Sequence, residues 1–225
     1  MSLKLLIGNK NYSSWSMRPW LALKAAGLPF EAEVLPLWTD AFTTALDALG
    51  VPRKVPVLVD DGVAIWESLA IIEHVAERFP PAPVWPADPL ARRHARSVSC
   101  EMHAGFAAVR SQLPMNLSRP PEPRAIDAAA MADVTRITHV WREARDRFGT
   151  GGDFLYGAFS AADAMFAPVA ARFRTYEVPL DPVCAAYVAA IHAYPAFGEW
   201  RMAALAEPWV VAEDEVDWPQ VKRES

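Results

Sequence analysis

The first third of the chain alternates between hydrophobic spacings typical of strands and spacings typical of helices. Residues 3–8 form a short apolar run, and residues 30–35 alternate polar and apolar side chains as a half-buried strand does. Between them, residues 17–26 place apolar side chains on one helical face, with Ser16 at the position of an N-cap. A weaker helical pattern covers residues 41–49. The order strand, helix, strand, helix is therefore predicted.

A hairpin and a third helix are predicted next. The apolar runs 57–59 and 64–66 flank an Asp-Asp-Gly sequence, and Asp-Gly between such runs is a strong hairpin signal. Because proline cannot donate to a sheet ladder, Pro56 must stand where the first of these strands begins. X-Pro bonds are also the ones that readily become cis. We therefore predict a cis Val55–Pro56 bond, which turns backbone polar groups outward, and a helix over residues 68–78.

The remainder of the chain is predicted to be helical. Five prolines between residues 79 and 89 forbid a regular helix and indicate a connection between domains. Helical patterns then cover residues 90–113, 125–148, 161–176, 182–193 and 195–206. These patterns predict a first domain over residues 1–79, a proline-rich linker over 80–89 and an all-helical domain over 90–225.

Two details of the helical part carry further predictions. Ser160 and Asp163 have the spacing of an N-terminal helix cap, which serves folding rather than catalysis. The acidic tail that starts at Glu207 is expected to fold back onto the protein through Trp209 and Trp218.

Composition limits the possible partners. The chain of 225 residues carries a net charge of -5 and has a pI near 5.6; this argues against a nucleic-acid partner, because phosphates attract a basic face. No apolar run approaches the roughly 20 residues of a membrane span, and Lys4 interrupts a signal-like start. Cys100 and Cys184 lack the spacing of a redox pair or a zinc site. We expect a cytoplasmic protein without metal or membrane contact.

The cis-proline, the hairpin and the Glu-Ser pair at the next helix start follow one another in an order that resembles the glutathione-binding half of the glutathione S-transferase family. In that family the cis-proline loop pairs with the cysteinyl backbone of glutathione, and the acidic residue and serine hold its γ-glutamyl end. The resemblance implies a thioredoxin-like α/β domain of order βαβαββα, an all-α second domain and glutathione as co-substrate. It places glutathione contacts at Ser13, Trp15, Lys54, Val55, Pro56, Glu67 and Ser68.

Glutathione chemistry requires a thiolate, whereas a free thiol with a pKa of about 8.5 is mostly protonated at neutral pH. The run from Ser13 to Arg18 is similar to the Ser-Ser-Cys-Ser-x-Arg signature of the zeta class, in which a serine of the first pair activates the thiol. This similarity implies Ser13 as the first candidate and Ser14 as the second, with Tyr12 as an alternative donor. Trp15 replaces the zeta-class cysteine, which puts the isomerase activity of that class in question and favours an apolar acceptor.

The acceptor side of the site is also suggested by a resemblance. Residues Gln112 and Asn116 to Ser118 match the zeta-class pattern Gln-x-x-x-Asn-Leu-Ser, which lines the acceptor side in that class. His103 and Arg110 lie about two turns apart in the same predicted helix and are expected to face one cleft. The resulting acceptor-site candidates are Tyr12, Arg18, His103, Arg110, Gln112 and Asn116.

The predicted function is therefore that of a glutathione transferase. The enzyme is expected to add glutathione to a small electrophile, or to reduce a peroxide, as in detoxification. The alternatives are isomerisation of maleylacetoacetate and a non-catalytic glutathione-binding stress protein. The family resemblance also implies a symmetric homodimer, with the arginines of the 90–113 helix near its two-fold axis.

Overall fold

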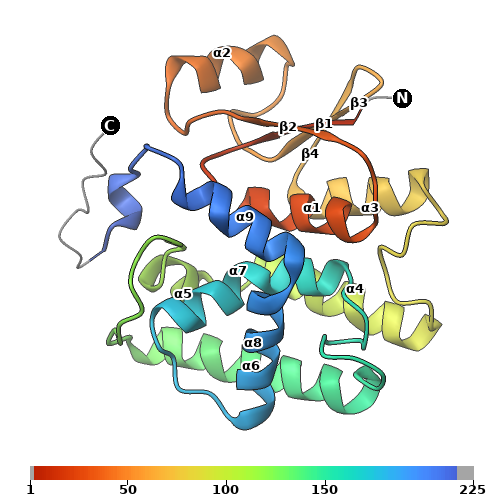
Figure 1. Ribbon diagram of the computed structural model, residues 1–225, viewed down its shortest axis with the longest axis vertical. Coiled ribbons are helices and arrows are strands. Elements are labelled where there is room, and N and C mark those ends of the chain that lie inside the picture. The colour runs from red at the N-terminus through yellow and green to blue at the C-terminus, as the bar shows by residue number, and fades with distance from the viewer. Residues whose placement is uncertain (1–2, 217–225) are drawn as a thin grey trace.

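The computed structural model describes residues 3–216, so the predicted role of Trp218 lies outside the described residues. Figure 1 shows a mixed sheet with helix α2 on one face, and helices α1 and α3 between its other face and the helical part. A thioredoxin-like α/β part followed by a helical part confirms the predicted fold class. The limits of the predicted domains, residues 1–79 and 90–225, remain a prediction.

The sheet has four strands: β1 (Leu3–Ile7), β2 (Glu31–Val34), β3 (Val57–Asp60) and β4 (Val63–Trp66). Their order in the sheet is β2-β1-β3-β4, and only β1 and β2 run parallel. Leu5 lies opposite Ala32 on one side and Leu58 on the other. Asp61 and Gly62 both have positive φ, which is the backbone that a tight hairpin turn requires. The predicted hairpin is thus confirmed.

Three helices flank the sheet: α1 (Ser14–Ala25), α2 (Asp40–Ala48) and α3 (Ser68–Arg78). Helix α1 begins earlier than predicted, because Ser13 and not Ser16 is its N-cap: the Ser13 hydroxyl accepts a hydrogen bond from the backbone N–H of Ser16. The Ser16 side chain instead accepts from the backbone N–H of Gly8 at 3.0 Å. Ser16 therefore ties the first turn of α1 to the end of β1.

The helical part surrounds one helix, α7, that is buried over nearly its whole length. Its elements are α4 (Pro89–Ala104), α5 (Ala107–Gln112), α6 (Ala128–Phe148), α7 (Ala161–Thr175), α8 (Pro182–Ala193), α9 (Pro195–Leu205) and the short 3-10 helix η1 (Ala212–Asp214). All residues of α7 except Arg174 are buried, and α7 packs against α1, α4 and α8. None of the helices within residues 3–216 has the length and apolar character that crossing a membrane requires.

The single helix predicted over residues 90–113 is divided into α4 and α5. Gly105 ends α4 at a point where an added Cβ would lie 2.8 Å from the carbonyl oxygen of Glu101. Phe106 follows in the left-handed region, with φ of 59°. Hydrophobic spacing continues through this break, so the periodicity of the sequence does not reveal it.

One core joins the sheet to the helical part. It extends from Leu5 and Leu58 in the sheet through α1 and α3 to Trp141 and Trp200. A smaller core lies between the sheet and α2, around Phe42. Helix α1 is thus packed from both sides, which fixes the loop in front of it.

The C-terminal tail returns to that loop, although not through Trp209, which is 39% exposed. The carboxylate of Glu207 accepts hydrogen bonds from the backbone N–H groups of Lys10 (2.8 Å) and Asn11 (3.2 Å). The indole N–H of Trp200 donates to the carbonyl of Lys10 at 2.9 Å. The predicted return of the tail is correct, but a carboxylate makes the attachment.

Candidate active site

A cavity of about 510 Å³ opens where the loop before α1 faces the helical part. It contains most of the predicted site residues. Those that line it are Tyr12, Ser13, Ser14, Trp15, Lys54, Val55, Pro56, Glu67, Ser68, His103 and Arg110. The remaining wall is formed by Leu37, Trp38, Phe42, Pro52, Arg53, Trp66, Met115, Arg172 and Asp214.

The start of α3 presents an unsatisfied hydroxyl to this cavity. Ser68 is 1% exposed, and its Oγ has no hydrogen-bond partner within residues 3–216. Ser68 is the first residue of α3, where backbone N–H groups lack helical partners and the helix dipole favours an anion. Glu67 precedes it with φ of 70°, and the Val55–Pro56 bond across from it is cis, as predicted. This corner is suited to hold a carboxylate.

Ser13 is the end of a short hydrogen-bonded chain. Its Oγ lies 2.8 Å from the Oγ of Ser16, which in turn accepts from the backbone N–H of Gly8. A hydroxyl can rotate to donate in either direction. In the structure Ser13 Oγ donates to Ser16 Oγ. If both hydroxyls rotate so that Ser16 donates to Ser13, the hydrogen of Ser13 becomes free to point into the cavity. Each bond in such a chain polarises the next, which strengthens the last donor.

Ser14 is held by an arginine that the sequence reasoning missed. Nη2 of Arg172 donates to Ser14 Oγ at 3.3 Å, and its Nε donates to the carbonyl of Leu113 at 2.7 Å. Arg172 is buried, and its Nη1 has no hydrogen-bond partner within the described chain. Burial lowers its pKa to about 10, so it stays charged at neutral pH. No local pattern predicts this role, because Arg172 reaches Ser14 through the packing of α7 against α1.

Tyr12 lines the cavity, but its hydroxyl is engaged. It forms a hydrogen bond with the carboxylate of Glu215 in the tail. Burial and this carboxylate raise the pKa of Tyr12 above its ordinary value. A phenol that donates to a carboxylate is a poor donor to a thiolate, so the geometry favours the serines.

Trp15 lies among three cationic or titratable side chains. The guanidinium of Arg18 lies 4.1 Å from the centre of its ring, that of Arg110 lies 5.3 Å away, and the His103 ring meets it edge-on at 5.3 Å. His103 also lies 3.7 Å from the carboxylate of Glu67. The structure thus brings His103 and Arg110 to the same cavity, as predicted, on either side of the break between α4 and α5.

Arg18 is not where the sequence reasoning placed it. It is fully buried beneath Trp15 and does not line the cavity, because α7 packs over this turn of α1. Its Nε donates to the carbonyl of Met165 at 3.0 Å, while Nη1 and Nη2 have no hydrogen-bond partner within residues 3–216. Burial, together with the charges of Arg172 and Arg110, holds the pKa of Arg18 well below its ordinary value.

Gln112 and Asn116 also lie outside the cavity lining. The Oε1 of Gln112 accepts from the backbone N–H of Asp127 at 3.0 Å. The Oδ1 of Asn116 accepts from the side-chain amide of Asn11 at 3.0 Å. The described structure therefore gives Asn116 a supporting position, since it fixes the loop that carries Ser13.

Comparisons with known proteins identify the fold that carries this cavity. The family model of the glutathione S-transferase N-terminal domain matches residues 12–78, and the model of the C-terminal domain matches residues 123–203. Together they cover more than half of the chain. The chain belongs to the glutathione S-transferase family. It is an enzyme of glutathione transferase type, and its relatives make it zeta-like, which confirms the resemblance seen in the sequence.

The curated relatives include maleylacetoacetate isomerases, one of them described as probable. A probable maleylacetoacetate isomerase of Caenorhabditis elegans is 39% identical over 93 residues, which are 41% of this chain and 42% of that protein. The enzyme of Rattus norvegicus is 29% identical over 178 residues, 75% of this chain and 77% of that protein.

Two solved structures of glutathione transferases share the fold. A Burkholderia glutathione transferase homologue with bound glutathione has a TM-score of 0.70 at 23% identity, over 92% of this chain and 100% of that one. Maleyl pyruvate isomerase, described as a bacterial glutathione S-transferase in the zeta class, has a TM-score of 0.68 at 23% identity, over 91% and 98%.

Proposed function

We propose that this glutathione transferase binds glutathione in the 510 Å³ cavity and adds its thiolate to a small electrophile. The observation that carries the proposal is that one cavity contains two helix starts, each with a serine hydroxyl. Ser68 at the start of α3 is unpartnered and suits the γ-glutamyl carboxylate, and Ser13 at the start of α1 suits the thiolate. Two anionic groups of one ligand would thus meet two sites built for anions.

Thiol ionisation would be supported from two directions. Ser13 donates a hydrogen bond, and the first turn of α1 presents its positive dipole end. Arg172 adds buried positive charge close to the same turn. Lowering a thiol pKa by one unit takes about 1.4 kcal/mol, which these groups together supply readily.

A second candidate reaction is supported by the cations on the acceptor side. Arg172 and Arg110 line the cavity beside Ser14 and Trp15, and they suit an acceptor that carries carboxylates. In isomerisation of a maleyl compound, the thiolate adds to one carbon of the double bond and the electron pair moves to the conjugated carbonyl. Rotation about the resulting single bond precedes expulsion of the thiolate, so glutathione is regenerated. The isomerases among the relatives favour this candidate, whereas Trp15 in place of cysteine favours an apolar acceptor.

Purified protein with glutathione should be assayed against a halogenated arene, an organic hydroperoxide and a maleyl compound. Turnover of the arene or the hydroperoxide supports the first reaction, and turnover of the maleyl compound without net loss of glutathione supports the second. The ultraviolet absorbance of bound thiolate tests the non-catalytic alternative, because a mere binding protein has no need to lower the thiol pKa.

Ser68→Ala is expected to weaken glutathione affinity by about tenfold and to leave the melting temperature unchanged or slightly higher. The hydroxyl makes no bond within the described chain, so its loss removes only a ligand contact and a buried unsatisfied group. Calorimetric titration with glutathione checks the affinity. Ser111→Ala is the control, because Ser111 is exposed and bonds within its own helix. Unchanged affinity in Ser68→Ala would remove Ser68 from the site.

Asp214 should make anion binding on the acceptor side depend on pH. It lines the cavity with Arg172, and burial raises its pKa to about 6. Above pH 6 the ionised carboxylate of Asp214 offsets the charge of Arg172. Below pH 6 the carboxyl group is protonated, so the charge of Arg172 is no longer offset. The affinity for a dicarboxylate inhibitor is therefore expected to rise as the pH falls through 6. Asp214→Asn should bind the inhibitor roughly threefold to tenfold more tightly at neutral pH and lose this dependence.

The exposed neighbour Glu213 supplies the control for this prediction, since Glu213→Gln removes the same charge without reaching the cavity lining. Equal effects of the two variants would show a general charge effect of the tail and contradict a specific role of Asp214.

We also propose a cytoplasmic symmetric homodimer. Val63 and Trp66 are exposed on the edge strand β4, and Leu90 and Met131 are exposed on α4 and α6. These apolar side chains support an arrangement in which the sheet part of one subunit meets the helices of the other. Sedimentation as a dimer at micromolar concentration is the expected result, and a monomer would contradict it.

A further inference from the structure

The loop between β1 and α1 is closed by hydrogen bonds within its own backbone. The carbonyl of Asn9 accepts from the N–H of Tyr12 (3.1 Å) and from the N–H of Ser13 (2.8 Å). The position of Ser13 therefore follows the path of the loop from Asn9 onward. The N–H groups of the next two residues, Lys10 and Asn11, bond instead to a residue near the C-terminal end of the described chain.

Glu207 binds both of these N–H groups. One oxygen of its carboxylate accepts from Lys10 at 2.8 Å, and the other accepts from Asn11 at 3.2 Å. Glu207 is 7% exposed and Asn11 is fully buried, so little water competes for these bonds. Hydrogen bonds to a charged acceptor are strong, and a buried backbone N–H without a partner is costly. The conformation of the loop therefore depends on a residue 197 positions further along the chain than Lys10.

Helix α9 fixes the place of this carboxylate. Figure 1 shows α9 alongside α1, against which it packs. The ring of Trp200 in α9 is fully buried and meets the ring of Trp20 in α1 edge-on, with 5.2 Å between the ring centres. Its indole N–H donates to the carbonyl of Lys10 at 2.9 Å. Glu207 holds the N–H of Lys10 and Trp200 holds its carbonyl, so the end of α9 fixes this residue from both sides.

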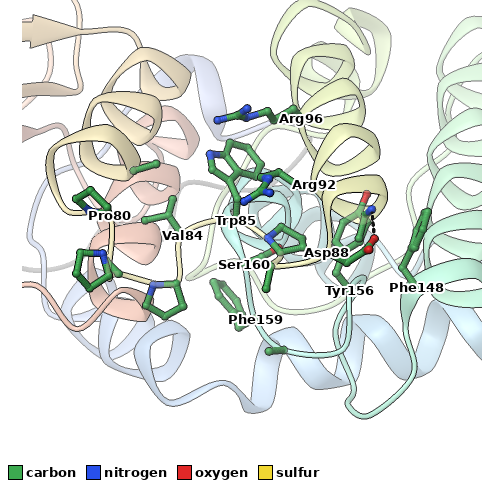
Figure 2. Close-up of a pocket in the computed structure, with 18 of the residues that line it drawn as sticks. Pro80, Val84, Trp85, Asp88, Arg92, Arg96, Phe148, Tyr156, Phe159 and Ser160 are labelled. Carbon is green, nitrogen blue, oxygen red and sulfur yellow. Dashed lines mark hydrogen bonds between the residues drawn. The ribbon is translucent and has the colours of Figure 1, made fainter.

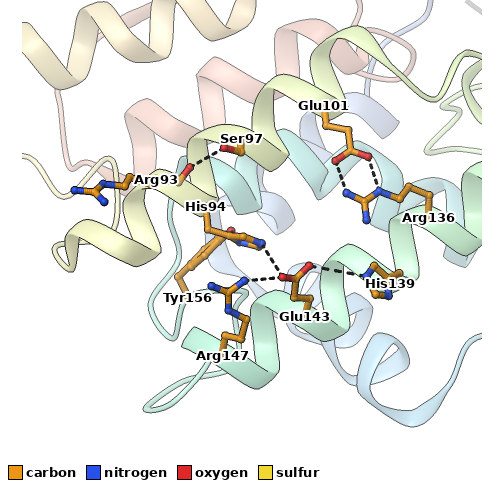
Figure 3. A network of polar contacts seen from close by, with 9 residues as sticks. All are labelled: Arg93, His94, Ser97, Glu101, Arg136, His139, Glu143, Arg147 and Tyr156. Atoms are coloured by element: carbon orange, nitrogen blue, oxygen red, sulfur yellow. Dashed lines mark hydrogen bonds and ion pairs between the residues drawn. The ribbon is translucent and has the colours of Figure 1, made fainter.

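Two carboxylates elsewhere in the chain provide a comparison. Asp88 lies in the wall of a separate cavity beside the proline-rich linker (Figure 2), where it accepts from a backbone N–H of its own helix, α4, at 2.7 Å. Glu143 contacts side chains of α4 and α6, as Figure 3 shows. None of these contacted residues lines the glutathione cavity. Glu207 differs from both carboxylates, because its partner Asn11 lies two residues before Ser13.

We propose that Glu207 is a positioning residue for thiol activation. It does not line the glutathione cavity, so it acts through the loop and not on the substrate. By holding Lys10 and Asn11, it fixes the turn that sets the place and direction of the Ser13 hydroxyl. A donor stabilises a thiolate only when it is held closely in place, and a small misplacement costs much of the rate. This inference rests on the proposed role of Ser13 as the donor to the thiolate.

The direction of the change in the thiol pKa separates positioning from a simple charge effect. Glu207→Gln removes a negative charge, and electrostatics alone would then stabilise the thiolate and lower the pKa of the bound thiol. The carboxamide keeps one acceptor oxygen and loses the other, so one N–H of the loop loses its partner. Positioning therefore predicts the opposite result, a higher pKa of bound glutathione. Glu207→Ala removes both acceptors and should raise this pKa further.

The ultraviolet absorbance of bound glutathione thiolate, followed as the pH is raised, measures this pKa. Turnover at neutral pH should fall about threefold in Glu207→Gln and about tenfold in Glu207→Ala, since less thiolate forms in each. The affinity for S-methylglutathione, which has no thiol, should stay unchanged and shows that each variant is folded. Asp88→Asn is the matched control, because it alters another carboxylate that accepts a backbone N–H. It should lower the melting temperature and leave the thiol pKa and turnover unchanged. Glu143→Gln controls in the same way for the loss of one negative charge.

A double variant tests whether the effect passes through Ser13. If it does, Glu207→Gln should cause no further change in turnover or thiol pKa when it is added to Ser13→Ala. An unchanged or lower thiol pKa in both Glu207 variants, or an equal loss of turnover with and without Ser13, would overturn the proposal. If Ser13→Ala lowers turnover and Glu207→Ala does not, this inference alone is wrong. If Ser13→Ala itself keeps full turnover, the proposed role of Ser13 is wrong and this inference fails with it.

Discussion

Ser13→Ala is expected to lower glutathione turnover at neutral pH by roughly a hundredfold or more while glutathione affinity changes little. Ser13 ends the hydrogen-bonded chain from Gly8 through Ser16 and opens into the cavity. Removing one donor to a developing anion in a well-organised site costs about 2 to 4 kcal/mol. The pKa of the bound thiol should rise in the variant, so part of the lost rate should return as the pH rises.

The measurement is the pH dependence of thiolate absorbance and of turnover in three variants. Ser14→Ala should lose less; its Oγ accepts from Nη2 of Arg172 and keeps its own hydrogen, so Ser14 is the second candidate donor. Ser13 is also the N-cap of α1, and loss of a cap costs about 1 kcal/mol of stability. Asp127→Ala removes the cap of α6 outside the cavity and controls for that effect.

The outcomes separate the candidates. If Ser14→Ala shows the larger loss of turnover and Ser13→Ala the smaller, then Ser14 is the residue that donates a hydrogen bond to the thiolate. Activation by a serine hydroxyl would still hold. If both variants keep full activity, serine activation is wrong. Tyr12 or a backbone N–H would then be the donor, and the contact between Tyr12 and Glu215 would have to break on glutathione binding.

The features that sequence predicted well are those with local causes. Proline before a strand, Asp-Gly in a turn and Ser-x-x-Asp before an apolar run each act within a few residues, through backbone geometry or capping. They correctly placed the cis Val55–Pro56 bond, the hairpin and the cap of α7. Ser68 at the start of α3 followed from the same local reasoning.

The buried arginines could not be placed from the sequence, because their positions depend on long-range packing. Arg18 is buried because α7 lies across α1, and Arg172 reaches Ser14 across the same contact. A helical pattern shows which face of each helix is apolar, but it does not show which two helices meet. Arg18, which was expected at the acceptor site, does not line the cavity, whereas Arg172, for which no role was predicted, does.

The match at Gln112 and Asn116 shows a further limit. The residues were recognised by pattern, yet Arg110 lines the cavity and Gln112, two residues further along α5 and so on another face of that helix, does not. The direction of α5 after the break at Gly105 and Phe106 depends on packing against α6 and not on the periodicity of either helix. The tail residue Asp214 was missed for the same reason, since nothing local links it to Arg172.

Asp163→Ala is expected to lower the free energy of unfolding by about 3 to 5 kcal/mol. The fully buried carboxylate accepts from the backbone N–H of Leu155 (3.0 Å), and from the backbone N–H (2.8 Å) and hydroxyl (2.9 Å) of Ser160. Each buried donor left unsatisfied costs about 1 to 3 kcal/mol. Because α7 is the central helix, the loss should appear in the unfolding of the whole chain by urea.

Asp127→Ala is again the matched control, since loss of this exposed cap of α6 should cost only about 1 kcal/mol.

The variant Asp163→Asn tests the effect of the charge of Asp163. Burial raises the folded pKa of Asp163 to about 6, above its unfolded value of 3.8, so the folded protein binds the proton more tightly. The contribution of Asp163 to stability must therefore decrease as the pH rises from 4 through 6. The free energy of unfolding of the original protein should therefore approach that of Asp163→Asn as the pH rises from 4 to 6. If the difference between the two free energies grows instead, the ionised carboxylate is better stabilised in the folded protein than its burial implies.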